Sequence, residues 1–276
     1  MHNHCPFVSC RENQLAARGQ DADTQWVRYP LPALEENMNR GRPEDRNRLS
    51  YWYPKLPSHI STPETTIIPY TGEDLINLLD GKIPEGFDIL IADITQAGYK
   101  LGWPMFLRTD YLSGKHNWKN TCHIPASTDV SDHVFRLVEE SAMADMMGFP
   151  TDCWVVRNLL PTLAAFIAFP GDMPIVKERR YFVRDATVVC HHPYWPREAF
   201  LRGNEPFNWE ELLAAINVED EDEVSLLSGL SSEVGGELGE EWSIDWLWSE
   251  KEGKWYLIDM AAAAQSYHWP GCPNAK

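Results

Sequence analysis

Two aspartates near the end of the chain are the residues best placed for chemistry. Asp245 and Asp259 lie in apolar runs, 242–248 and 254–260, separated by a short polar turn, which indicates the two strands of a hairpin. Strand side chains alternate between faces, so both carboxylates share a face if Asp245 lies opposite Leu257 or Asp259, whereas a one-residue slip separates them. Paired carboxylates in apolar surroundings need a cation, and Mg²⁺ held with a phosphate substrate suits their hard oxygens. The alternative is that each aspartate pairs with an arginine or caps a turn.

Basic residues surround a Ser-Gly pair in the middle of the chain. Arg108 ends a run, 103–108, that reads as a strand, and Lys115 and Lys119 follow Ser113-Gly114 in a polar loop. Glycine lets the backbone approach a phosphate, and neighbouring cations neutralise its charge. The spacing differs from that of a Walker loop. The alternative is an ordinary surface loop with basic residues.

Two further segments place arginines inside apolar strands. Arg157 interrupts the run Val155-Val156-Arg157-Asn158-Leu159, where a charge is either paired or functional. In the segment Glu178-Arg179-Arg180, an extended backbone turns Glu178 and Arg180 to one side and Arg179 to the other. We therefore expect one arginine inside a cleft and its neighbour outside.

The cysteines and histidines give no strong metal or nucleophile motif. The six cysteines form no CxxC pair, and a chain of this length buries a core without disulfides. Adjacent residues in Cys190-His191-His192 face opposite sides of a strand, which disfavours a metal site there. Metal-ligand side chains also crowd the N-terminus, where we interpret the segment as a mobile tail rather than a zinc site: His2, His4, Cys5 and Cys10.

Composition excludes several function classes. The 276 residues include 41 acidic and 24 basic side chains, a net charge of −17 that disfavours general nucleic-acid binding and would suit a basic peptide partner. Hydrophobic residues make up 43%, as in globular proteins. The longest apolar candidate, 159–169, contains Pro161 and falls short of the roughly 18–20 residues of a membrane helix. The N-terminus lacks the pattern of a signal peptide, so we expect a cytoplasmic protein without membrane attachment.

The predicted elements mix helices and strands without strict βαβ alternation, which indicates the α+β class. The acidic stretch 219–223 is expected to be a solvated helix end or loop. The expected helices cover 73–79, 87–100, 132–147 with Ser131 as its cap, and a segment that begins in a capping box at Asn208 and Glu211. The expected strands cover 65–68, 103–108, 153–160, 180–183, 187–190, 242–248 and 254–260.

Taken in order, these segments resemble the ATP-grasp superfamily. The likeness is to the divergent clade that includes a eukaryotic translation-initiation-factor assembly protein, and to related bacterial and phage proteins that carry an Arg and two Lys. The hairpin that bears Asp245 and Asp259 resembles the family's metal hairpin. The run 106–118 is similar to the clade's strand and phosphate loop, 178–183 to its Glu-x-Arg-x-Phe-Val strand, and 155–157 to the strand before the adenine hinge.

The resemblance implies two α+β lobes that clasp ATP. By this likeness Asp245 and Asp259 ligate Mg²⁺. The other site residues that it implies are Arg108 and Lys115 on the phosphates, Arg157 and Glu178 in the nucleotide cleft, and Arg180 on the transferred phosphate. It also implies a division into a polar N-terminal segment, 1–48, an α/β subdomain, 49–107, and ATP-grasp lobes, 108–276.

The family's chemistry activates a carboxylate as an acyl phosphate for attack by an amine or similar nucleophile, so the resemblance implies a Mg·ATP-dependent ligase with a small-molecule or peptide substrate. Many family members place Asn two residues after the second acid, where this chain has Ala261, which removes one metal oxygen. After the hairpin, the eukaryotic relatives have Gln-Arg, where this chain has His191-His192. The alternative function is therefore an ATP-binding assembly or regulatory protein without ligase turnover.

Overall fold

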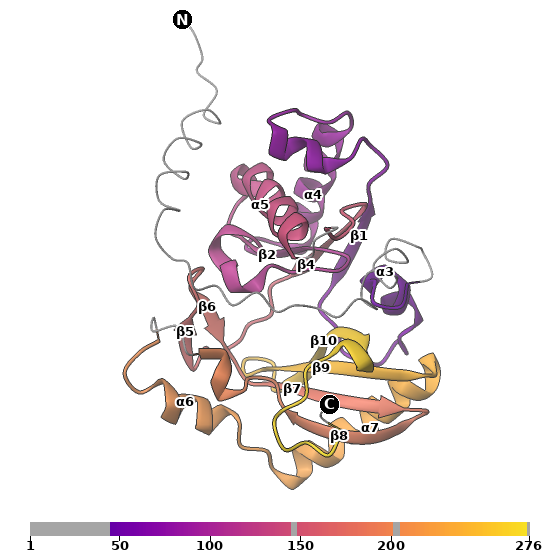
Figure 1. Ribbon diagram of the computed structural model, residues 1–276, viewed down its shortest axis with the longest axis vertical. Helices are drawn as coiled ribbons and strands as arrows, with labels where there is room; N and C mark the ends of the chain where they lie inside the picture. Colours follow the sequence, from indigo (N-terminus) through magenta and orange to yellow (C-terminus); the bar gives the residue numbers. More distant parts are fainter. Residues whose placement is uncertain (1–44, 145–147, 201–204, 275–276) are drawn as a thin grey trace, which may run out of the picture. The chain divides into compact units, whose positions relative to one another are not determined.

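The first sheet of the protein is a four-stranded antiparallel sheet that carries two helices on one face (Figure 1). The computed structural model describes residues 45–144, 148–200 and 205–274, which lie in one compact unit, 39–276. The strand order is β1-β4-β2-β3. The strands are β1 (Thr65–Pro69), β2 (Met105–Thr109), β3 (His123–Ile124) and β4 (Cys153–Asn158), and the helices are α4 (Phe87–Leu101) and α5 (Val130–Met143).

Strand alternation decides what each face of this sheet does. Leu107 and Val156 point into a core with Leu90 and Ile94 of α4, as the helical spacing of the apolar residues in 87–100 predicts. The opposite face carries Arg108 and Arg157 toward the second sheet, because both residues are one position away from core residues.

The start of helix α5 differs from the prediction. Its first residue is Val130, its N-cap is Asp129, and no side chain caps it. Ser131 therefore lies inside the helix, and its prediction as the cap is wrong. The apolar residue Val130 is fully buried, and its packing in the core favours the earlier start.

The second sheet has the order β10-β9-β7-β8, all antiparallel. Both predicted hairpins are confirmed: β7 (Glu178–Arg184) with β8 (Thr187–Pro193), and β9 (Glu241–Ser249) with β10 (Lys254–Ala262). One face packs on helix α7 (Glu221–Leu238), which the sequence patterns did not predict (Figure 1). Ile244 and Trp246 lie in that core, so Asp245 faces away from the helix.

A third, smaller core is built from aromatic side chains. The hairpin of β5 (Phe166–Ala168) and β6 (Met173–Ile175) packs with the 3-10 helix η6 (Arg197–Phe200) and helix α6 (Trp209–Ile216). Asn208 is the N-cap of α6 as predicted, but its side chain makes no capping hydrogen bond, so the capping box is not formed.

Short helices complete the described chain, and they are α3 (Leu49–Trp52), η2 (Tyr53–Lys55), η3 (Leu75–Asp80), η4 (Lys115–Asn120), η5 (Ser127–Asp129) and η7 (Ala263–Gln265). The helix predicted over 73–79 is the 3-10 helix η3. Strand β2 includes both residues of the predicted domain boundary at 107/108. The domain division stays a prediction. Within the described residues, no helix is long and apolar enough to cross a membrane.

Candidate functional site

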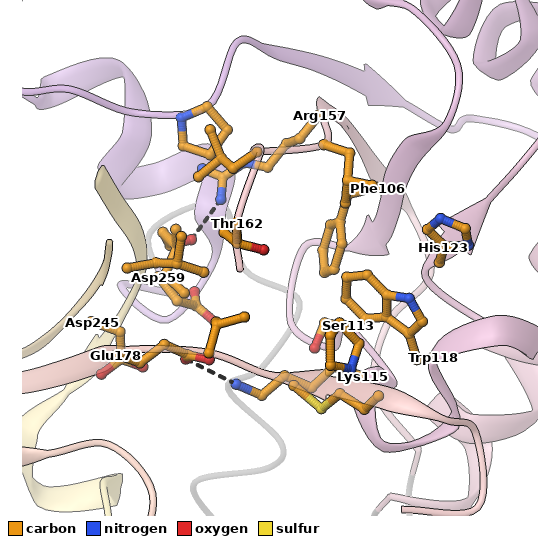
Figure 2. Close-up of a pocket in the computed structure, with 18 of the residues that line it drawn as sticks. Phe106, Ser113, Lys115, Trp118, His123, Arg157, Thr162, Glu178, Asp245 and Asp259 are labelled. Atoms are coloured by element: carbon orange, nitrogen blue, oxygen red, sulfur yellow. Dashed lines mark hydrogen bonds and ion pairs between the residues drawn. The ribbon is translucent and has the colours of Figure 1, made fainter. Parts of the chain in front are cut away.

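A cavity of about 500 Å³ is lined by strands β2 and β4 of the first sheet and β7, β9 and β10 of the second (Figure 2). All of the predicted site residues except Arg180 line it, and Arg180 contacts one of its walls through Asp245. The lining side chains with charge are Arg108, Lys115, Arg157, Glu178, Asp245 and Asp259. The volume lies in the range of small-molecule sites.

The two aspartates are cross-strand partners, as one of the two registers considered from the sequence predicts. Asp259 of β10 lies opposite Asp245 of β9, whereas Leu257 lies opposite Trp246. A β-bulge at Ile258 supplies the extra residue. Without it, Asp259 would lie opposite Ile244 and would face the core beneath α7. The bulge therefore places both carboxylates on the cavity side.

Each of these carboxylates pairs with an arginine. Asp245 accepts two hydrogen bonds from Arg180, Nε to Oδ1 and Nη2 to Oδ2, both at 2.7 Å. Asp259 Oδ2 lies 2.8 Å from Nη1 of Arg108, and its side chain is 38% exposed, against 9% for Asp245. Desolvation lowers the pKa of Arg180, but the charge and hydrogen bonds of Asp245, together with the nearby Tyr194 and Asp259, outweigh burial and raise this pKa above the ordinary value.

Lys115 enters the cavity directly after a tight backbone turn. Gly114 has φ +60, and a Cβ there would lie 3.1 Å from Leu137 and 3.2 Å from Thr121, so backbone conformation and space both favour glycine. Lys115 Nζ lies 3.5 Å from Glu178 Oε2 (Figure 2) and 4.0 Å from the centre of the Tyr194 ring. Burial lowers the pKa of Lys115, but the combined effect of Glu178, Tyr194 and Asp245 outweighs burial and the net shift of this pKa is upward.

Arg157 lines the cavity and has one unused donor. Its side chain donates from Nε to Thr65 Oγ1 at 3.1 Å and from Nη1 to the Ile258 carbonyl, whereas Nη2 is buried with no hydrogen-bond partner among the described residues. Burial, together with the positive charge of Arg108, lowers the pKa of Arg157 to about 10. Among the described residues this buried guanidinium therefore lacks a carboxylate partner, which leaves Nη2 available to a further acceptor.

Glu178 begins strand β7 at the floor of the cavity and is 2% exposed. Its Oε1 accepts a hydrogen bond from Trp195 Nε1 at 3.2 Å. Burial raises the pKa of Glu178, and the nearby cation of Lys115 opposes that shift. Lys119, which the sequence grouped with Lys115, instead pairs with Asp172 at 2.6 Å on an exposed surface.

Arg179 lies outside the cleft, on the other face of β7, as the alternation predicts, and it is buried there. Its side chain is fully buried on the α7 side of the sheet, where it donates to Glu223 of that helix and to the carbonyls of Ile216 and Val218. Glu223 is also buried and pairs with Lys177 as well, so the prediction that 219–223 is solvated is wrong at this residue. Both arginines are internal, on opposite faces of β7.

The other side of the cavity is apolar and aromatic. Figure 2 shows Phe106, Trp118 and His123 across the cavity from the aspartates, where Phe106 and Trp118 lie 5.7 Å apart and Trp118 stacks on His123 at 5.5 Å. Met173 of the β5-β6 hairpin and Val176 also line the cavity. Sequence reasoning missed this hairpin because its strands are too short for a periodic signal.

The turn of this hairpin is locked against the loop that follows Gly114. Gly171 N donates to the His116 carbonyl at 3.2 Å, and Lys119 N donates to the Gly171 carbonyl at 3.0 Å. A Cβ at Gly171 would lie 2.2–2.3 Å from backbone atoms of Asn117 and Trp118. Only glycine allows this approach, which fixes two walls of the cavity relative to each other.

Comparison with solved structures shows that the chain shares the α+β fold of Cdc123. Cdc123 from Schizosaccharomyces pombe is similar in fold: its C-terminally truncated form has a TM-score of 0.51, 15% identity and coverage of 78% of this chain and 83% of that chain. A second Cdc123 structure has a TM-score of 0.50 and 16% identity, covering 78% and 82%.

The ATP-grasp ligase PsnB gives a weaker likeness, with a TM-score of 0.43 and 12% identity over 83% of this chain and 56% of that chain. No protein-family model matches the sequence, and no curated protein matches it significantly. At these identities the likeness shows the fold alone.

Proposed function

We propose that this protein binds Mg·ATP in the cavity and uses it to join a carboxylate to an amine or a similar nucleophile. The observation that carries the proposal is the division of the cavity into two kinds of wall. The aromatic and apolar wall fits a purine base, and the opposite wall combines cations with the aspartate pair, as a polyphosphate with a divalent cation requires.

The charge balance favours an anionic ligand. Cations outnumber carboxylates at the cavity, although the whole chain carries a charge of −17. The cations are Arg108, Lys115, Arg157 and Arg180, and the carboxylates are Glu178, Asp245 and Asp259. Nη2 of Arg157 adds a donor that has no acceptor within the described part of the chain. A phosphate chain supplies acceptors for such donors, and charge-assisted hydrogen bonds of this kind are the strong ones.

The residues present also fit Mg²⁺. Asp245 and Asp259 offer carboxylate oxygens from adjacent strands, on the side that faces the cavity. When bound, Mg²⁺ supplies neutralisation of the phosphate charge. To bind it, the aspartates would share or exchange their present partners, Arg180 and Arg108, and both guanidiniums would then be available to phosphate oxygens.

In the proposed reaction a substrate carboxylate attacks the γ-phosphorus of ATP, and ADP leaves with the electron pair of the broken P–O bond. The amine then attacks the acyl carbon, phosphate leaves, and the amine nitrogen loses a proton. Arg108 and Lys115 hold phosphate oxygens, and Arg180 stabilises the transferred phosphoryl group. Positioning and cation stabilisation carry most of the catalysis in such transfers. The carboxylate substrate is a small molecule or a peptide.

Ala261 favours a second candidate function, an ATP-binding assembly or regulatory protein without ligase turnover. Ala261 lies opposite Ser243, two residues beyond Asp259, and offers a methyl group where a metal-binding amide would stand. Fewer metal oxygens would still allow nucleotide binding while they slow phosphoryl transfer. ADP release in the presence of carboxylates and amines separates the two functions.

The test of nucleotide binding is thermal unfolding of the wild type, Asp245→Ala and Asp259→Ala with and without Mg·ATP. Ligand at about 100 times its dissociation constant adds about 2.7 kcal/mol to the free energy of unfolding. We expect this gain in the wild type and its loss in both variants. Lys119→Ala, at an exposed ion pair outside the cavity, is the matched control and keeps the gain. No gain for the wild type at millimolar Mg·ATP would overturn the proposal.

A further inference from the structure

The chain after β10 crosses the cavity-facing side of the second sheet. Ser266 Oγ lies 2.5 Å from Ser243 Oγ on β9, the His268 ring stacks on Phe182 of β7 at 3.7 Å, and Asn274 Nδ2 donates to the Val189 carbonyl of β8 at 3.4 Å. Figure 1 shows this yellow segment lying over the sheet and reaching β8. The segment, 263–274, therefore spans three strands.

The segment brings a histidine and a cysteine to a second cysteine. His268 Nδ1 lies 3.4 Å from Cys272 Sγ and 3.7 Å from Cys190 Sγ of β8, and all three atoms lie within 4.8 Å of one another. Both cysteines are free thiols. Thiols are weak hydrogen-bond donors, so direct contacts among these groups give little stabilisation.

These distances match a tetrahedral metal centre. With zinc bonds of about 2.3 Å to sulfur and about 2.05 Å to nitrogen at tetrahedral angles, a nitrogen and a sulfur ligand lie about 3.6 Å apart, and two sulfurs about 3.8 Å. The measured separations of 3.4 and 3.7 Å lie on either side of the first value. His268 and Cys272 are also separated by three residues, a spacing at which one chain segment supplies two ligands to a single zinc ion.

We propose that Cys190, His268 and Cys272 bind a Zn²⁺ ion, with a fourth position open to water. Two thiolates and an imidazole are the ligands that zinc prefers over Mg²⁺, which favours oxygen. This site is distinct from the aspartate pair and does not depend on the proposed function. His191 faces away and stacks on Tyr181 at 5.0 Å, and His192 stacks on Trp269 outside the three-residue group, so Cys190 is the residue of that motif in the group.

The zinc ion would fasten the C-terminal segment beside the candidate active site. Cys190 lies opposite Phe182 across β8 and β7. Two residues along the strands on the same face, Arg180 lies opposite both His192 and Asp245. Trp269, directly after His268, stacks on His192 at 5.6 Å. Because the segment covers the sheet next to the Arg180–Asp245 pair, the zinc ion would hold a wall beside that pair in place.

The test measures metal content in the full-length protein, purified without chelator. We expect about one zinc ion per chain. Replacement by Co²⁺ should give the visible absorption of a tetrahedral centre with thiolate charge-transfer bands. Cys272→Ser and His268→Gln should reduce zinc content at least about tenfold, since each removes one of three protein ligands. In the wild type, chelation should increase hydrogen exchange in 263–274.

The matched control is the double variant Cys5→Ser/Cys10→Ser, which removes thiols of the N-terminal His/Cys group. It should keep its zinc. Loss of zinc in this variant, with zinc retained in Cys272→Ser, overturns the proposal. Reduced protein that takes up no zinc also overturns it, as does an octahedral, sulfur-free Co²⁺ spectrum. The Co²⁺ spectrum and exchange data come from the wild type, so a variant that fails to fold does not prevent the test.

Discussion

Of the two adjacent arginines of β7, Arg179 should stabilise the fold and Arg180 should act in the proposed reaction. A matched pair of substitutions can separate these two roles. Arg179→Met keeps the apolar part of the side chain but removes the guanidinium that bonds Glu223 and the carbonyls of Ile216 and Val218. Since Arg179 is fully buried, these groups lose their donor where water cannot replace it. We expect a large loss of stability without a change at the cavity.

The magnitude follows from burial. Breaking a buried ion pair by removing one partner costs about 3–5 kcal/mol, and with about 2–4 °C per kcal/mol for a chain of this size the unfolding temperature should fall by about 6–20 °C. In Arg180→Met, the lost partner is Asp245. The Arg180 side chain is 15% exposed and lies beside the cavity, so water hydrates the aspartate and the cost should be about 1–3 kcal/mol.

The assay is thermal unfolding of both variants with and without Mg·ATP, combined with ADP release. At temperatures where it is still folded, Arg179→Met should keep the stabilisation by Mg·ATP and any turnover. Arg180→Met should still bind Mg·ATP but lose turnover. The reasoning is refuted if Arg179→Met unfolds within about 2 °C of the wild type. Unchanged ADP release in Arg180→Met would likewise remove Arg180 from the proposed reaction.

Further predictions concern the loops, the thiols and the aromatic wall. Gly171→Ala should lower both the unfolding temperature and the Mg·ATP affinity, whereas the control Gly229→Ala, at an open position in α7, should raise stability by up to about 1 kcal/mol in thermal unfolding. Burial raises the pKa of Cys122 and of Cys153 to about 12. Alkylation of both should therefore be about a thousandfold slower at pH 8 than in denaturant and rise only in strong alkali, measured by mass spectrometry. Trp118→Ala should weaken Mg·ATP binding about tenfold in calorimetry, because it removes an aromatic wall.

The sequence predicts the parts of this fold that have a regular pattern. Helix α4 and the hairpin of β9 and β10 were predicted because apolar spacing and turn residues agree over many positions. Helix α7 was missed since its polar and glycine-containing sequence lacks a continuous apolar stripe, and packing against β7 and β8 determines it instead. Tertiary contacts override local preference there.

For the charged residues of the site, too, local sequence patterns predict only part of the structure. Alternation along β7 predicted that Glu178 and Arg180 share a face, and they do lie toward the cavity. It could not show that Arg179 is also internal, because the partner that makes its burial possible, Glu223, is 44 residues away. Similarly, Cys190 joins His268 only because the chain returns across the sheet, which no local pattern records.

The bulge at Ile258 makes strand length, rather than residue identity alone, a determinant of the site. Its extra residue turns Asp259 toward Asp245, and its carbonyl also accepts a hydrogen bond from Arg157 of the other sheet. Deleting one residue here would reverse the facing of the β10 residues on one side of the bulge, even though every aspartate and arginine remained in the chain. In a mutational scan, this strand should tolerate many conservative replacements but no single-residue deletion.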